Sequence, residues 1–133
     1  MNRISAVAAL FFVASAAFAA APAKQTLPSG VVVEHIKQGS GAAPTASSTV
    51  VVNYRGTLDN GTEFDSSYKR GVPATFPLNR VSPCWTEGMQ LIKVGGKAKL
   101  TCPSSTAYGP RGIPGVIDPN TQLNFEVEVL AIK

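Results

Sequence analysis

The strictest constraint on the fold of this 133-residue chain is an alternation of apolar and polar residues near its end. From Leu123 to Val129, every odd position is apolar and every even position is Asn or Glu. A period of two is that of a β-strand, whose side chains point alternately to the two faces of a sheet. The pattern therefore predicts a strand with one buried face and one wet face, which is typical of an antiparallel sheet.

Two earlier segments also have strand composition. Val31–Ile36 and Thr49–Arg55 are rich in β-branched residues, and we expect each to form a strand. Gly39–Ser48 between them consists of small and polar residues with one proline, which predicts a loop. Asp59–Gly61, with the sequence Asp-Asn-Gly, is a turn signal that should reverse the chain after the second of these strands.

One helix is predicted, and it begins after Ser82–Pro83. Serine can cap free amide groups, and proline is tolerated at the first helical position because its missing N–H had no partner there. Trp85, Met89 and Ile92 recur at helical spacing, and Gly95–Gly96 should end the helix. No strand–helix–strand repeat occurs, so we predict an α+β fold: an antiparallel curved β-sheet wrapped around one short α-helix.

The N-terminal residues are predicted to be a secretory signal peptide. Arg3 supplies a positive charge, and Ile4–Phe18 is an apolar stretch without any charge. Ala17–Ala19 has the small-x-small pattern of a cleavage site, with Ala19–Ala21 as the second choice. The run is shorter than the roughly 20 apolar residues that span a bilayer, so no stable membrane anchor is expected. We assign 1–19 to the signal peptide, 20–29 to a flexible N-terminal tail, and 30–133 to a single domain.

The charge of the chain argues against a nucleic-acid partner. The formal net charge is +4, and the lysines and arginines are scattered without a basic run interleaved with aromatic residues. We therefore expect the positive charge to serve solubility and weak surface attraction.

Cys84 and Cys102 are the only cysteines. In an exported chain such a pair is a disulfide candidate, and the alternative is two separate buried thiols. A zinc site is not expected, because His35 is the only histidine and is distant from both cysteines, which leaves too few ligands. We predict neither a metal nor a cofactor.

The second half of the chain carries a recognisable series of short motifs. Val51–Gly56 contains Tyr54, and Phe64–Ser67 has the sequence Phe-Asp-Ser-Ser. They are followed in order by Phe76, Trp85–Gly88, Ala107–Gly109 and Ile113–Ile117. In this order the motifs resemble the FKBP-type peptidyl-prolyl cis-trans isomerases, and the resemblance covers about Gly30 to Lys133.

The resemblance implies an active site without a nucleophile. In the family, a shallow aromatic pocket holds a proline, and the proline-rich segment from Pro103 to Thr121 would be the flap beside it. Three polar side chains, those of Tyr54, Asp65 and Tyr108, would form the catalytic set. Tyr108 would bond a substrate carbonyl through its hydroxyl, Asp65 would serve polar orientation, and Tyr54 would also supply part of the wall. Trp85 would be the floor, with walls and rim supplied by Phe64, Phe76, Val81, Ser82, Ile113, Ile117 and Phe125.

Several of these residues also have an ordinary structural interpretation. Trp85 and Phe125 lie at core periodicities, Tyr54 could be a core tyrosine, and Asp65 could bond local backbone in an Asx turn. Ser82 stands where many relatives have isoleucine, which makes the rim more polar. Its backbone N–H matches the position that receives a substrate carbonyl.

The resemblance also implies partners and a compartment. We expect a monomer in the periplasm that accelerates X–Pro isomerisation in unfolded or partly folded polypeptides and so assists the folding of exported proteins. One alternative is a chaperone module that binds proline segments with little turnover. The other is a structural domain whose aromatic residues all belong to the core.

Overall fold

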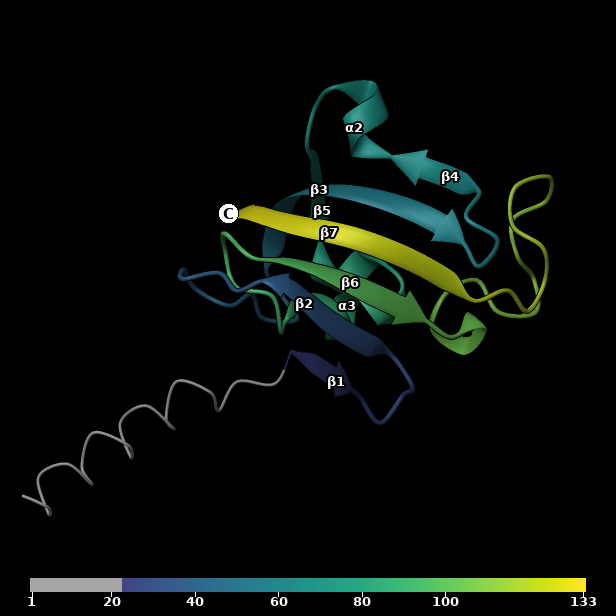
Figure 1. Ribbon diagram of the computed structural model, residues 1–133, viewed down its shortest axis with the longest axis horizontal. Coiled ribbons are helices and arrows are strands. Elements are labelled where there is room, and N and C mark those ends of the chain that lie inside the picture. Colours follow the sequence, from purple (N-terminus) through teal and green to yellow (C-terminus); the bar gives the residue numbers. More distant parts are fainter. Residues whose placement is uncertain (1–22) are drawn as a thin grey trace, which may run out of the picture.

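Seven strands form one antiparallel sheet in residues 23–133, the part of the chain that the computed structural model describes. The strand order is β1-β2-β6-β7-β3-β4, and β5 also pairs with β3 (Figure 1). The strands are β1 (Lys24–Thr26), β2 (Val32–Lys37), β3 (Thr49–Leu58), β4 (Glu63–Ser66), β5 (Ala74–Pro77), β6 (Lys97–Cys102) and β7 (Leu123–Ile132). The helices are α2 (Ser67–Arg70) and α3 (Pro83–Met89), with 3₁₀ turns η1 (Leu78–Arg80) and η2 (Ser104–Thr106).

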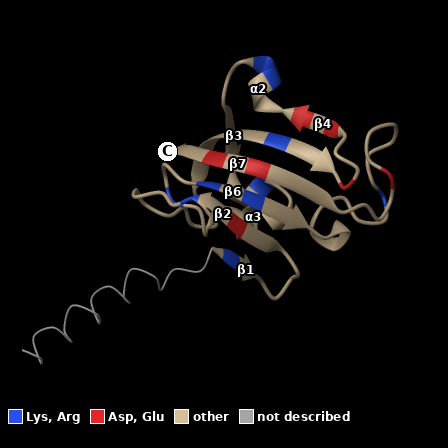
Figure 2. Ribbon diagram, viewed as in Figure 1, with Lys and Arg blue, Asp and Glu red and all other residues tan. Residues whose placement is uncertain are grey.

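The predicted α+β fold is confirmed, and β7 lies at its centre. This strand pairs with β3 on one side and β6 on the other, and the odd residues from Leu123 to Val129 are buried as the alternation predicts. The even residues face outward, where Glu126 lies opposite both Arg55 and Lys99 and forms an ion pair with Lys97 at 2.9 Å. Figure 2 shows this arrangement as acidic segments on β7 between basic segments on β3 and β6. Charges of opposite sign therefore balance each other across this face.

The helix α3 packs closely against β6. A Cβ atom on Gly88 would come within 2.9 Å of the Leu100 side chain, so glycine permits this close approach. Pro83 occupies the start of the helix as predicted, but the Ser82 side chain makes no capping hydrogen bond. The helix ends at Met89, well before Gly95–Gly96, and a tight turn follows in which the Ile92 N–H donates to Met89 O. Ile92 lies beyond the helix and is nevertheless fully buried.

The prediction of a flexible tail over 20–29 is wrong where this segment forms a strand. Lys24–Thr26 forms β1 and pairs with β2 in an antiparallel hairpin. The connecting turn is closed by hydrogen bonds between Leu27 and Val31 and from Gly30 N–H to Leu27 O, and Gly30 adopts a φ of 93°. Small polar residues suggested a loose segment, but main-chain pairing does not depend on apolar side chains. The predicted signal peptide, 1–19, lies outside the described residues.

The remaining predictions for the elements agree with the structure. The strands expected at 31–36 and 49–55 correspond to β2 and to a longer β3, and Asp59–Gly61 forms the turn between β3 and β4. The segment 39–48 contains neither helix nor strand. The short helix α2 was not predicted; the Ser66 hydroxyl caps its N-terminus, and Gly71, with a φ of 73°, ends it. Within residues 23–133, no helix has both the length and the apolar character needed to cross a bilayer.

Candidate active site

A cavity of about 430 Å³ opens between α3, the flap and the strands β3, β4, β5 and β7. Nine of the residues that line it were predicted from the sequence as site residues. All of these except Asp65 are aromatic, apolar or hydroxyl-bearing. The lining residues are Tyr54, Phe64, Asp65, Phe76, Arg80, Val81, Ser82, Trp85, Ala107, Tyr108 and Phe125. Segments far apart in the sequence thus converge on one hollow.

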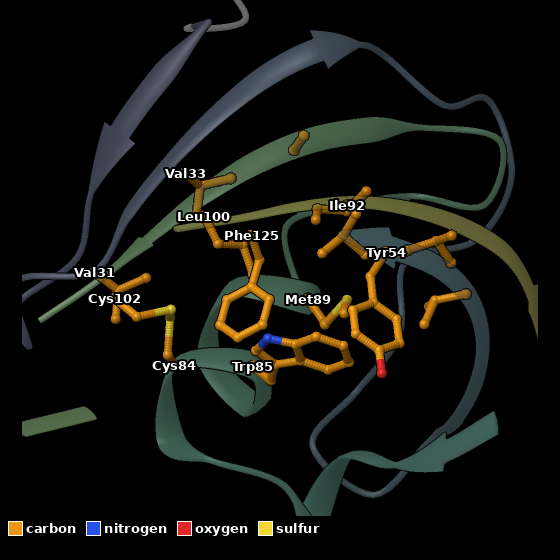
Figure 3. Packing of buried hydrophobic residues seen from close by; sticks show 14 of the residues in the cluster. Val31, Val33, Tyr54, Cys84, Trp85, Met89, Ile92, Leu100, Cys102 and Phe125 are labelled. Carbon is orange, nitrogen blue, oxygen red and sulfur yellow. A yellow bond between two sulfur atoms is a disulfide. The ribbon is translucent and has the colours of Figure 1, made fainter. Parts of the chain in front are cut away.

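Trp85 lies at the centre of the aromatic group. Its ring meets Tyr54 and Phe76 at centroid distances of 5.1 Å each and Phe125 at 5.2 Å, all in edge-to-face geometry. Figure 3 shows the indole between the rings of Tyr54 and Phe125, with its nitrogen beside Phe125. The indole Nε1 is buried and has no hydrogen-bond partner among residues 23–133. Edge-to-face contacts on several sides fix the plane of the indole and give the pocket a rigid floor.

A second aromatic pair forms one wall. Phe64 on β4 and Phe125 on β7 pack edge to face at 5.6 Å. Both rings lie over Gly56 on β3, where a Cβ atom would come within 2.6 Å of Phe64 and 2.9 Å of Phe125. Gly56 therefore makes room for this wall. Gly56 was not among the predicted site residues, although a glycine inside a strand is a recognised signal of close approach.

The polar wall is a hydrogen-bonded group of three side chains. The Tyr54 hydroxyl donates to Asp65 Oδ2 at 2.6 Å, and Arg70 donates to Asp65 Oδ1 at 2.7 Å. A second guanidinium nitrogen of Arg70 donates to the Tyr54 hydroxyl, also at 2.7 Å. Asp65 also accepts a hydrogen bond from the Ser66 backbone at 2.9 Å. Arg70 was not predicted as a site residue, because it belongs to no motif; it is the last residue of α2, directly before Gly71.

These contacts set the charge state of the wall. Burial raises the pKa of Asp65, but hydrogen bonds from Tyr54 and Arg70 together outweigh it, so the pKa lies below the ordinary carboxyl value. Burial and the hydrogen bond to Asp65 raise the pKa of the Tyr54 hydroxyl. Asp65 is therefore ionised and Tyr54 is neutral around neutral pH, and neither is suited to proton transfer.

The rim between η1 and α3 offers backbone and side-chain donors. Val81 and Ser82 line the cavity as predicted, and they join η1 to the first turn of α3. The backbone N–H of Ser82 makes no backbone hydrogen bond within residues 23–133. Arg80 also lines the cavity and was not predicted.

The flap brings Tyr108 to the cavity and leaves the two isoleucines outside it. Tyr108 is 43% exposed, and its hydroxyl has no hydrogen-bond partner in the described part of the chain. Ile113 and Ile117 do not line the cavity; they pair with each other at the base of the flap and pack against the core. These two residues therefore do not lie at the rim of this cavity, where they were predicted. Ala107 takes a place beside Tyr108 instead.

Cys84 and Cys102 form a disulfide, and both are fully buried. The bond joins the first turn of α3 to the end of β6 beside Trp85 (Figure 3). It therefore ties the floor of the pocket to the sheet. Within residues 23–133, no group of three or more His, Cys, Asp or Glu side chains could hold a metal ion.

Comparisons with known proteins point to one family. Residues 40–130 match the family model described as FKBP-type peptidyl-prolyl cis-trans isomerase. The chain is 51% identical over 116 residues to FkpA of Escherichia coli K12, covering 87% of this chain and 43% of the relative. It is 46% identical over 112 residues to Mip of Coxiella burnetii, covering 84% of this chain and 49% of the relative. The chain thus spans less than half the length of these curated relatives.

Solved structures give the same result. The crystal structure of FkpA from Escherichia coli superposes with a TM-score of 0.80 at 50% identity, covering 87% of this chain and 54% of the other. The crystal structure of a peptidyl-prolyl cis-trans isomerase from Pseudomonas syringae gives a TM-score of 0.78 at 34% identity. That alignment covers 100% of this chain and 96% of the other.

Proposed function

Because this chain belongs to the FKBP-type peptidyl-prolyl cis-trans isomerase family, we propose that it accelerates rotation about X–Pro bonds in polypeptides. The observation that carries the proposal is the cavity itself: an aromatic slot whose floor is fixed by three edge-to-face contacts. At its rim lie two groups without partners in residues 23–133, the Tyr108 hydroxyl and the Ser82 backbone N–H. A proline ring fits such a slot, and the rim can bond the carbonyls beside it.

The chemistry of the reaction suits a site of this kind. Resonance gives the peptide bond a rotational barrier of about 18–20 kcal/mol, so that X–Pro bonds interconvert over tens to hundreds of seconds. The half-rotated amide has lost its resonance and is less polar than either planar form. The free energy of the twisted state relative to the planar forms is therefore lower in an apolar slot than in water. Contacts that are specific to the twisted state lower the barrier further.

Each residue of the cavity has a role in this account. Trp85 holds the proline ring from below, and Phe64, Phe76, Phe125 and Val81 enclose it. The Tyr108 hydroxyl donates to one substrate carbonyl and the Ser82 N–H to another, which holds the chain on both sides of the rotating bond. Asp65 and Arg70 hold Tyr54 in place as the polar wall. No covalent intermediate or proton transfer is needed.

The role in the cell is inferred from the predicted signal peptide together with the family. We propose that the chain is exported, acts in the periplasm, and assists folding of exported proteins that contain proline. Relatives named FkpA and an outer membrane protein named MIP from Legionella longbeachae, 45% identical over 112 residues, support this assignment. Mass determination of the protein recovered from the periplasm tests it: a chain that begins at Ala20 is expected, and a chain retained in the cytoplasm with Met1 would contradict it.

Refolding of a protein limited by a slow proline phase tests the activity. We expect the rate of the slow phase to rise in proportion to the concentration of the chain, while its amplitude stays constant. A variant with Trp85→Ala is expected to lose this effect. Suppression of aggregation without acceleration would contradict catalysis and favour the binding module. An absence of both effects would leave only the structural interpretation.

A further inference from the structure

We propose that Arg80 selects substrates with an acidic residue near the proline. This inference rests on the proposed function, because it concerns the substrate preference of the same cavity. It starts from the two charged residues that line the cavity, Asp65 and Arg80, which differ in their surroundings.

The carboxylate of Asp65 is already neutralised. Arg70 binds it at 2.7 Å, and the Tyr54 hydroxyl binds its other oxygen. Its charge is thus satisfied inside the protein, and a cationic substrate gains little from it. The pair of Asp65 and Arg70 adds no net charge to the cavity.

Arg80 is in the opposite situation. It ends η1 at the rim, its side chain is exposed, and it forms neither an ion pair nor a side-chain hydrogen bond with any residue of 23–133. Elsewhere on the sheet, charges of opposite sign lie next to each other, as in the pair of Lys97 and Glu126. The cavity therefore has a net positive charge that comes from one side chain, two residues before the free N–H of Ser82.

The position of Arg80 two residues before Ser82 places the acidic residue close to the proline in the substrate. If the Ser82 N–H bonds a substrate carbonyl on one side of the proline, a side chain one or two residues further along on that side comes within reach of the Arg80 guanidinium. An arginine presents several N–H donors in a planar fork that matches a carboxylate. Because Arg80 is exposed, solvent screens the attraction, and we expect a modest preference that weakens as salt increases.

The test is a series of peptides that contain one proline. In each peptide, one of the two positions before the proline or the two positions after it carries Glu, Gln or Lys. The cis–trans exchange rate of each peptide is measured by NMR at low and high salt. At one of these positions we expect kcat/KM for Glu to exceed that for Gln by about threefold, and that for Lys to be lower by a similar factor. In Arg80→Gln the ratio falls to one, and in Arg80→Glu it reverses. Arg80→Lys should keep part of the preference.

Lys93→Gln is the matched control, because it removes the same charge from an exposed turn near Gly39, outside the cavity lining. This variant should keep the preference of the wild type. An equal rate for Glu, Gln and Lys at all four positions would overturn the inference, as would a preference that persists in Arg80→Gln. The Gln peptides report the basal activity, so failure of the proposed function would appear as absence of exchange with every peptide.

Discussion

At the scale of single residues, the side chains that line the cavity differ in how much they also contribute to the fold. Tyr108 shows this difference most clearly, because the residue is 43% exposed and its hydroxyl makes no hydrogen bond within residues 23–133. Trp85 shows the reverse, since the same indole is the pocket floor and part of the buried core. Substitutions at these two positions should therefore have different consequences.

Tyr108→Phe removes only the hydroxyl at the rim. A hydrogen bond to a neutral group contributes about 0.5–1.5 kcal/mol, so kcat/KM should fall by roughly two- to tenfold. The midpoint of thermal unfolding should not change. Peptide exchange by NMR and a thermal melt of the same sample check both. A variant with unchanged turnover would remove Tyr108 from the site.

Trp85→Ala should abolish turnover and also destabilise the protein. Deleting a buried tryptophan side chain costs about 3–5 kcal/mol, so a folded but inactive variant needs a milder change. Trp85→Phe keeps an aromatic ring in the core while it shortens the floor. We expect this variant to stay folded, as judged by circular dichroism, and to lose about tenfold or more in kcat/KM. A folded Trp85→Phe with full activity would contradict the role of the floor.

Asp65 governs a pH dependence of stability. Because its pKa is lowered in the folded chain, its stabilisation is present above the ordinary carboxyl value of 3.8 and is lost as the pH falls through the lowered pKa. Asp65→Asn has the same shape but cannot ionise. The difference in melting temperature between wild type and this variant should be constant from about pH 5 to 8 and shrink below about pH 4. A difference that grew on acidification would show that folding raises the pKa of this carboxyl instead of lowering it.

At the scale of elements, the flap is held by its own hydrogen bonds. Ile113 and Ile117 bond each other through both backbone pairs, and the Asn120 N–H donates to Gly109 O. Gly112 lies inside this turn with a φ of 61°, and a Cβ atom there would come within 2.3 Å of Ile117 O. Gly115 also has positive φ, at 77°, but a Cβ atom there would meet nothing within 4 Å.

This contrast provides a matched pair of variants. Both Gly112→Ala and Gly115→Ala carry the strain of a left-handed residue, about 1–2 kcal/mol, but only Gly112→Ala must displace the backbone of the flap. We expect Gly112→Ala to lose protection of the Ile113 and Ile117 amides in hydrogen exchange and to lower kcat/KM, because Tyr108 shifts with the flap. Gly115→Ala should keep most of the amide protection and most of kcat/KM. Equal effects of the two substitutions would show that the clash at Gly112 does not matter.

The elements also show how far the sequence could predict this structure. The alternation in β7 and the turn at Asp59–Gly61 were sufficient to predict their elements, because each depends on side-chain period or on local turn chemistry. β1 was missed because its pairing uses main-chain groups, which composition does not reveal. The helix α3 ends at Met89, directly after which the sequence carries no glycine or proline stop signal, and Ile92 beyond it is buried in the core.

The site shows a similar division. Residues within motifs, such as Trp85 and Tyr108, were assigned correctly to the cavity. Arg70, Arg80 and Gly56 were missed because their importance depends on neighbours that are distant in the sequence. Ile113 and Ile117 were placed at the rim from the resemblance, whereas the fold of the flap turns them toward the core.

At the scale of the whole molecule, the disulfide joins the helix that carries the pocket floor to the sheet that forms the core. It closes a loop between residues separated by 18 positions. A loop of this size stabilises the folded chain by about 3 kcal/mol through the entropy of the unfolded state.

The double variant Cys84→Ala/Cys102→Ala should therefore unfold at a temperature lower by on the order of 10 °C. A reductant should lower the melting temperature of the wild type and leave that of the variant unchanged. Equal melting temperatures of wild type and variant, with the bond confirmed by mass spectrometry, would contradict this contribution.

One measurement tests the central claim, that the aromatic cavity is where X–Pro bonds rotate. Trp85 is the only tryptophan, so its indole N–H gives a single resonance in the pocket floor. A proline peptide is titrated into the chain while that resonance and the cis–trans exchange of the peptide are followed in the same NMR samples. The account predicts that the indole shift and the acceleration of exchange saturate together with the same midpoint. Acceleration without any shift of the indole would place catalysis elsewhere and contradict the account, and a shift without acceleration would reduce the cavity to a binding site.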